Sequence, residues 1–177
     1  MESKSLRKYQ RDDAKFLASI PCSACFNEQR TGKTPTALEV IKLRRLQEER
    51  ILIITTASSI YQWKEEYETW LGKPCEVCAG TPTNKMKAIG SWTHGLVVSL
   101  DSFKETESRS GLVQPILARE PKMVIIDEAH KIKNPKSANA KAAFKTRNIP
   151  FRLALTGTPA QGKPYDVFSI LKFLFPR

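Results

Sequence analysis

Residues 124–130 read Val-Ile-Ile-Asp-Glu-Ala-His, an apolar run that ends abruptly in two acidic side chains. A short, continuous apolar run is typical of a strand covered on both faces, as in a parallel sheet. In such sheets, ligands bind beyond the carboxyl ends of the strands. Asp127 and Glu128 would lie there, where Asp127 can hold Mg²⁺ through its water shell and Glu128 can orient or deprotonate an attacking water. The alternative explanation is an ordinary acidic pair at the start of a helix.

The rest of the chain alternates apolar runs with helical patterns on both sides of this segment. Strands are expected near 22–26, 51–54, 76–79, 96–100, 122–126 and 151–155. Helices are expected over 5–18, 34–49, from Ser58 or Ser59 to about 70, 83–90, 114–119, 137–145 and 165–173. This alternation predicts an α/β fold with a doubly wound, mostly parallel sheet flanked by helices. Residues 1–177 have the length of a single domain, and we predict one.

A second motif, Thr31-Gly32-Lys33-Thr34, follows a predicted strand and opens a predicted helix. Free backbone N–H groups and the positive end of the helix would face phosphates there. The Lys33 ammonium would add a charge at the β- and γ-phosphates, and the Thr34 hydroxyl would ligate Mg²⁺. The triplet alone also fits an ordinary helix start, because Asn27 stands where a phosphate-binding loop has its first glycine. Two motifs in the right order, each after a strand, favour the nucleotide site.

Composition narrows the class of protein. Hydrophobic residues make up 41% of the chain and charged residues 27%, which excludes wholesale disorder. No apolar run approaches the roughly 18–20 residues that span a bilayer, and no apolar stretch marks a signal peptide, so we expect no membrane partner and a cytoplasmic protein. The formal net charge of +11 predicts a polyanionic partner such as nucleic acid.

Four cysteines form two C-x-x-C pairs, Cys22 with Cys25 and Cys75 with Cys78, a pattern that many structural zinc sites share. The pairs lie 49 residues apart, whereas compact zinc modules have roughly 12–20 residues between them. Both pairs also fall in predicted strands, where residues three apart point to opposite faces. We therefore predict small buried core residues and not a zinc site.

In its ordered motifs the chain resembles the first, RecA-like motor lobe of the Swi/Snf-type helicase-like ATPases of superfamily 2. The matching stretches are Leu6–Gln10 for the adenine motif, Glu28–Thr34 for the phosphate loop, Thr55–Trp70 with its Gln62-Trp63-Lys64-Glu65-Glu66, Asp127–Asn134 for DEAHRIKN and Leu155–Pro159 for LTGTP. They extend over nearly the whole chain. Arg30 and Thr31 depart from the Gly-Leu that is usual in the phosphate loop.

The resemblance implies a role for each matching residue. Those implied to bind ATP are Arg7, Gln10, Arg30, Thr31, Gly32, Lys33 and Thr34. Lys33, Asp127 and Glu128 would be catalytic, with Thr34 and Asp127 holding Mg²⁺. Those implied to face DNA or to couple it to the nucleotide are Ser58, Ser99, His130, Thr156, Gly157 and Thr158. The side chain of Gln10 would hydrogen-bond the adenine edge.

The same resemblance implies ATP and Mg²⁺ as cofactors, duplex DNA bound without sequence specificity, and a second RecA-like lobe that supplies an arginine to the transferring phosphoryl group. Only 18 residues follow Pro159, so we expect that lobe in a longer protein or in another chain. The alternative function is a nucleic-acid-binding module with a vestigial nucleotide pocket. The intact Lys33, Thr34, Asp127 and Glu128 favour the ATPase lobe.

Two further features have ordinary explanations. Trp63, Tyr67 and Trp70 recur at helical spacing, which predicts core packing and not base stacking. A basic stretch could contact phosphates or form a solvated helix face, and it contains Lys131, Lys133, Lys136, Lys141 and Lys145.

Overall fold

The computed structural model describes residues 5–28, 31–105, 111–158 and 165–176, and it places six parallel strands in one sheet. The strands are β1 (Cys22–Cys25), β2 (Ile51–Thr55), β3 (Cys75–Cys78), β4 (Gly95–Ser99), β5 (Met123–Ile126) and β6 (Phe151–Leu155). Their order across the sheet is β1-β6-β5-β2-β4-β3, and every described pairing is parallel. The prediction of a doubly wound parallel sheet is therefore confirmed.

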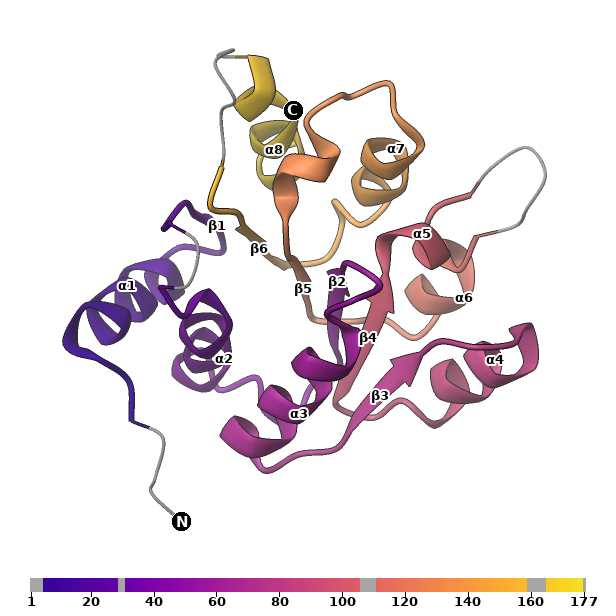
Figure 1. Cartoon of the computed structure of the whole chain (residues 1–177), viewed down its shortest axis with the longest axis horizontal. Helices are drawn as coiled ribbons and strands as arrows, with labels where there is room; N and C mark the ends of the chain where they lie inside the picture. The colour runs from indigo at the N-terminus through magenta and orange to yellow at the C-terminus, as the bar shows by residue number, and fades with distance from the viewer. Residues whose placement is uncertain (1–4, 29–30, 106–110, 159–164, 177) are drawn as a thin grey trace.

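Helices cover both faces of the sheet (Figure 1). One face packs against α1 (Lys8–Ser19), α2 (Lys33–Leu43) and α3 (Ile60–Leu71). The other packs against α4 (Pro82–Ser91), α5 (Leu100–Phe103), α6 (Val113–Leu117), the 3₁₀ turn η1 (Ala129–Ile132), α7 (Ala138–Phe144) and α8 (Tyr165–Leu174). No helix in the described part of the chain combines the length and apolar character that crossing a bilayer requires.

Residues alternate between these two cores along each strand. In β2, Ile51 and Ile53 belong to the core under α1–α3, whereas Leu52 and Ile54 belong to the opposite core. All four side chains are fully buried, which explains why the strand reads as a continuous apolar run. The register sets Ile54 opposite Ile126, so the carboxyl ends of β2 and β5 lie at the same edge of the sheet.

The element boundaries differ from the predictions where helix ends carry no sequence signal. The helix predicted over 34–49 ends at Leu43. Arg45 adopts a left-handed conformation with φ 58°, and its N–H and that of Leu46 bond back to Lys42 and Ile41, which is the Schellman arrangement. Glycine usually marks this cap, and its absence hid the helix end. The short elements α5 and η1 were also not predicted.

The cysteine pairs lie at opposite edges of the sheet, on β1 and β3. Five strand spacings, about 24 Å, separate these edges, so the two pairs cannot share one metal ion. Within each pair the side chains also diverge, with Cys22 and Cys78 in one core and Cys25 and Cys75 in the other. All four thiols are buried and free, as predicted.

Candidate functional site

The predicted phosphate loop connects β1 to α2, and its Gly32 determines how the helix begins. Gly32 is the N-cap of α2 with φ 80°, a left-handed conformation that glycine adopts without strain. Its carbonyl accepts bonds from the N–H and the hydroxyl of Thr36. The N–H groups of Lys33 and Thr34, the first two residues of α2, have no helical acceptor and can bind an anion.

Gln10 lies directly against this loop. Its Nε2 donates to the Thr31 carbonyl at 2.9 Å, and its Oε1 accepts from the Arg7 N–H at 2.8 Å. These two bonds fix which end of the amide is the donor, and among the described residues they leave one N–H and one lone pair without a bond. The Tyr9 hydroxyl donates to the same Thr31 carbonyl. One donor and one acceptor side by side are what an adenine edge pairs with.

A cavity of about 300 Å³ opens beside Gln10. Its lining residues are Ser5, Arg7, Tyr9, Gln10, Thr31, Gly32, Pro35 and Trp70. The cavity therefore joins the predicted adenine motif to the phosphate loop. Trp70, predicted as a core residue, is only half-buried and forms part of this wall.

The Lys33 ammonium is held by its own loop. It donates to the carbonyls of Asn27 and Glu28 at 3.1 and 2.9 Å. The Asn27 side chain in turn donates to the Asp13 carboxylate of α1 at 2.7 Å. Asn27, which departs from the usual first glycine, thus ties the loop to α1. A bound phosphate would replace these two weakly basic carbonyls as the acceptor of the Lys33 ammonium.

Asp127 follows β5, and its carboxylate is fixed by three donors. The Thr55 hydroxyl and the Trp63 indole N–H donate to Oδ2 at 2.9 and 2.8 Å. The Glu128 N–H donates to Oδ1 at 3.0 Å. A carboxylate oxygen can accept more than one hydrogen bond, so Oδ1 can also accept a hydrogen bond from a water bound to Mg²⁺. No local sequence pattern pairs Thr55 or Trp63 with this group.

Glu128 has a left-handed backbone, with φ 51° and ψ 48°. This conformation is uncommon for a residue other than glycine, and such strain gathers at functional sites. Its Oε2 lies 3.1 Å from His130 Nδ1, which also lies 3.2 Å from the Thr156 hydroxyl oxygen. That oxygen accepts the Thr158 N–H. Polar contacts therefore connect the segment that follows β5 to the segment that follows β6, beyond the carboxyl ends of the strands.

The phosphate loop follows β1 and the acidic pair follows β5, and only β6 lies between these two strands in the sheet. At about 4.8 Å per strand, the ends of β1 and β5 are roughly 10 Å apart at the same edge. Mg²⁺ is usually bound by one or two protein oxygens together with substrate phosphates and water. The Thr34 hydroxyl and the Asp127 carboxylate are oxygen donors of this kind, so the donor set fits the ion.

The other predicted residues lie at the same edge with different exposure. Ser58 is exposed between β2 and α3, where its hydroxyl lies 3.0 Å from that of Thr56. Ser99 is buried, and its hydroxyl caps α5 by accepting the Ser102 N–H. Gly157 is half-buried. Arg30 lies outside the described residues, so its predicted role stays a prediction.

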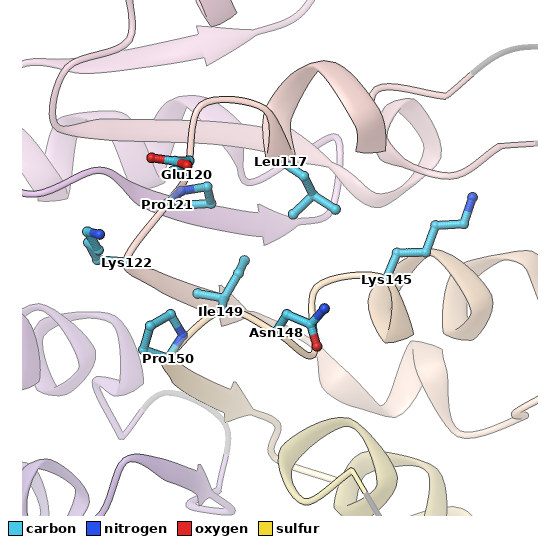
Figure 2. Close-up of a pocket in the computed structure, with 8 residues that line it drawn as sticks. All are labelled: Leu117, Glu120, Pro121, Lys122, Lys145, Asn148, Ile149 and Pro150. Atoms are coloured by element: carbon cyan, nitrogen blue, oxygen red, sulfur yellow. The ribbon is translucent and has the colours of Figure 1, made fainter.

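Another cavity, of about 390 Å³, lies at the amino ends of β5 and β6, away from the predicted site (Figure 2). Its walls are the segments that precede β5 and β6, including Glu120, Lys122 and Asn148. It contains none of the residues predicted to bind ATP, Mg²⁺ or DNA by resemblance, although Lys145 of the basic stretch lines it. Among the described residues, no group of three or more His, Cys, Asp or Glu side chains could hold a metal ion.

Comparison with known proteins adds evidence independent of this geometry. The model of the SNF2-related domain matches residues 9–177. DNA excision repair protein ERCC-6 of Homo sapiens is 28% identical over 198 residues, covering 98% of this chain and 13% of that protein. DNA repair protein RAD5B of Arabidopsis thaliana is 36% identical over 129 residues, covering 70% and 10%. DNA repair and recombination protein RAD54-like of Gallus gallus is 26% identical over 200 residues, covering 97% and 26%.

A solved structure shares the fold. The Sulfolobus solfataricus SWI2/SNF2 ATPase core, determined in complex with dsDNA, matches with a TM-score of 0.76 and 23% identity over 98% of this chain and 36% of that one. The present chain spans 10–26% of the length of the three relatives above.

Proposed function

The chain belongs to the SNF2-related domain family, and we propose that it is the ATP-binding first lobe of a Swi/Snf-type ATPase that couples ATP hydrolysis to movement on duplex DNA. The observation that carries this proposal is that the groups proposed to bind the base, the phosphates and Mg²⁺ all lie at one edge of the sheet, beyond the carboxyl ends of its strands. Gln10 and the phosphate loop lie beyond β1, and the fixed carboxylate of Asp127 lies beyond β5, two strands away.

Each group has a distinct task at this edge. Gln10 binds the adenine edge with its free donor and acceptor, while the first turn of α2 and Lys33 bind the phosphates. Thr34 and Asp127 hold Mg²⁺, which neutralises negative charge on the phosphates when it is bound. Glu128 orients the water that attacks the γ-phosphate and accepts its proton. His130 connects that carboxylate to Thr156, the first residue after β6.

A second lobe is required for fast turnover. The transition state needs positive charge opposite the phosphate loop, which an arginine from a second domain supplies in many such enzymes. Among the described arginines, Arg44, Arg50, Arg119 and Arg152 donate to backbone carbonyls away from this edge, and Arg7 lines the cavity beside the adenine motif. We therefore propose that the arginine comes from a second RecA-like lobe in the full-length protein or in another chain.

Duplex DNA is the proposed polymer. The formal net charge of +11 supports an anionic partner, and Lys131 and Lys136 are exposed in the segment that follows Glu128. Three related proteins named above are DNA repair proteins, and the solved neighbour was determined with dsDNA. A backbone-directed contact of this kind is independent of sequence.

Nucleotide binding tests the proposal. Mg-ADP and Mg-ATP should stabilise the chain, by about 2.7 kcal/mol at 100 times the Kd. Lys33→Ala should abolish the stabilisation while circular dichroism stays unchanged, because the Lys33 ammonium, within the described part of the chain, donates to carbonyls of its own loop and not to the core. The matched control is Lys8→Ala, an exposed lysine at the start of α1. If the wild type shows no shift at millimolar nucleotide but still binds DNA, the alternative of a binding module with a vestigial pocket replaces this proposal.

A further inference from the structure

We infer that Trp63 is a positioning residue for the Asp127 carboxylate and thereby sets how tightly the nucleotide complex holds a divalent cation. The inference rests on the proposed function, because it concerns the cation that accompanies the nucleotide. The Trp63 side chain is 2% exposed, and its indole N–H donates to Asp127 Oδ2 at 2.8 Å. A tryptophan predicted to be a core residue thus contacts the group proposed to hold the metal.

Strand alternation brings the contact about. Side chains of odd-numbered residues in β2 and β5, such as Ile53 and Ile125, face the core under α1–α3. Thr55 and Asp127 continue this alternation at the strand ends, and the register of Ile54 with Ile126 sets them side by side. Both therefore face α3, the helix that carries Trp63.

The bond to Trp63 does more than fill hydrogen-bonding capacity. Asp127 Oδ2 is occupied by two donors, which directs Oδ1 toward the open edge of the sheet, where its described partner is the Glu128 N–H. Trp63 holds this arrangement from within a helix, since its backbone N–H donates to the Ser59 carbonyl in the first turn of α3. Without the indole donor, the carboxylate keeps only Thr55 on that oxygen and gains freedom to rotate.

Another buried tryptophan shows what a purely structural indole looks like. Trp92 is fully buried on the opposite face of the sheet, and its N–H donates to the carbonyl of His94, two residues along the chain. A buried indole N–H usually finds a partner, and a backbone carbonyl is sufficient for that purpose. Trp63 instead uses a carboxylate 64 residues away in sequence. The pair therefore offers a matched comparison.

The expected effect is on cation affinity. Hydrogen-bond partners that orient a metal-binding carboxylate typically change metal affinity about 10- to 100-fold when removed. Trp63→Phe keeps an aromatic side chain and removes the donor. We expect Mn²⁺ bound in the ADP complex, measured by electron paramagnetic resonance, to dissociate at least about 10-fold more readily than in the wild type. The affinity for ADP in the presence of EDTA should stay unchanged.

Three variants separate positioning from packing. Trp92→Phe removes an equally buried indole bond and should leave Mn²⁺ affinity at the wild-type value. Thr55→Val removes the other donor to Oδ2 with almost no change in volume, and it should weaken Mn²⁺ binding as Trp63→Phe does. If Trp63→Phe does not fold, Thr55→Val still tests the role of Oδ2.

A spectroscopic measurement tests the contact itself. The chain has three tryptophans, so its indole N–H region should contain three signals that single Trp→Phe variants assign. Asp127→Asn should move the Trp63 signal and leave that of Trp92 in place.

Equal Mn²⁺ affinity in Trp63→Phe and Trp92→Phe, with normal wild-type binding, overturns this inference alone. A Trp63 signal that ignores Asp127→Asn also overturns it. A wild type that binds neither ADP nor Mn²⁺-ADP contradicts the proposed function, and the inference fails with it.

Discussion

Gln10 and Gly32 are in such close contact that a Cβ atom at position 32 would displace the Gln10 amide. A Cβ atom added to Gly32 would lie 2.2 Å from Gln10 Nε2, the nitrogen that donates to the Thr31 carbonyl. Gly32 also has φ 80°, which L-residues with a side chain rarely adopt. The glycine of the phosphate loop is therefore required twice, by the turn into α2 and by the glutamine that rests on it.

Gly32→Ala should lower the free energy of unfolding by more than the roughly 1–2 kcal/mol that a left-handed alanine costs. Urea titration measures this change. Gly72→Ala is the control for backbone strain alone, because Gly72 has φ 64° and open space around its Cβ position. Gly90→Ala, in helical backbone with open space, should instead stabilise by about 0.5–1 kcal/mol. Equal losses for Gly32→Ala and Gly72→Ala would contradict the close contact.

Gln10→Ala should reduce the preference for adenine over guanine nucleotides. Two hydrogen bonds of about 1 kcal/mol each are lost, so ATP affinity should fall by about 10- to 30-fold while GTP affinity changes little. Competition against a fluorescent nucleotide measures both. Gln62→Ala, an exposed glutamine of α3, serves as the control. Parallel losses for ATP and GTP would show that Gln10 supports the loop without reading the base.

Residues 1–177 alone should bind Mg-ATP and hydrolyse it very slowly, with little stimulation by duplex DNA. The arginine proposed to come from a second lobe is typically worth about 10³–10⁵ in rate. Steady-state phosphate release with and without duplex measures this, with Glu128→Gln as the blank and Glu65→Gln, an exposed α3 variant, as the control. Robust DNA-stimulated hydrolysis that Glu128→Gln abolishes would falsify the need for a second lobe.

DNA binding should weaken steeply with salt and ignore sequence, because neutralised phosphates release counterions. If Lys131 contacts a phosphate, Lys131→Ala should reduce the slope of log affinity against log salt by about 1. Lys122→Ala is the matched control, since Lys122 is also exposed but precedes β5, at the amino ends of the strands. Titrations of two unrelated duplexes at several salt concentrations provide the measurement. Equal slopes for the two variants would remove Lys131 from the interface.

The buried thiols should make the fold less stable at alkaline pH. Burial raises the pKa of Cys78 to about 11 and also raises the pKa values of Cys25 and Cys75. An unfolded thiol has a pKa of roughly 8.5, so above that pH the unfolded chain loses protons that the folded chain retains. Stability is thus fully present below pH 8.5 and falls as the pH approaches 11.

Melting temperatures from pH 7.5 to 10.5 measure this decline, which should be shallower in Cys78→Ala. Zinc or a chelator should leave the melting temperature unchanged at pH 7.5, because the two cysteine pairs lie at opposite edges of the sheet. Strong stabilisation by zinc would overturn the assignment of all four cysteines to the core.

The strands, their parallel arrangement and the chemistry at their ends could all be predicted from the order of the residues. Apolar runs such as residues 51–54 predict buried strands because a strand with helices on both faces has no polar side. Asp127 and Lys33 were identified because short-range patterns, a strand ending in carboxylates and a loop opening a helix, encode their positions. These signals are local, and they need no knowledge of packing.

The side chains that contact those groups could not be predicted in this way, because they come from other parts of the chain. The contact of Trp63 with Asp127, the contact of Asn27 with Asp13, and the pocket wall formed by Trp70 all join segments that are distant in sequence. Helical spacing predicts that a tryptophan faces the apolar core, but it does not predict which acceptor its indole N–H will bond. Only the register of β2 against β5, together with the packing of α3 over their ends, brings that N–H to a carboxylate, because hydrogen bonds depend on positions in space and not on separation along the chain.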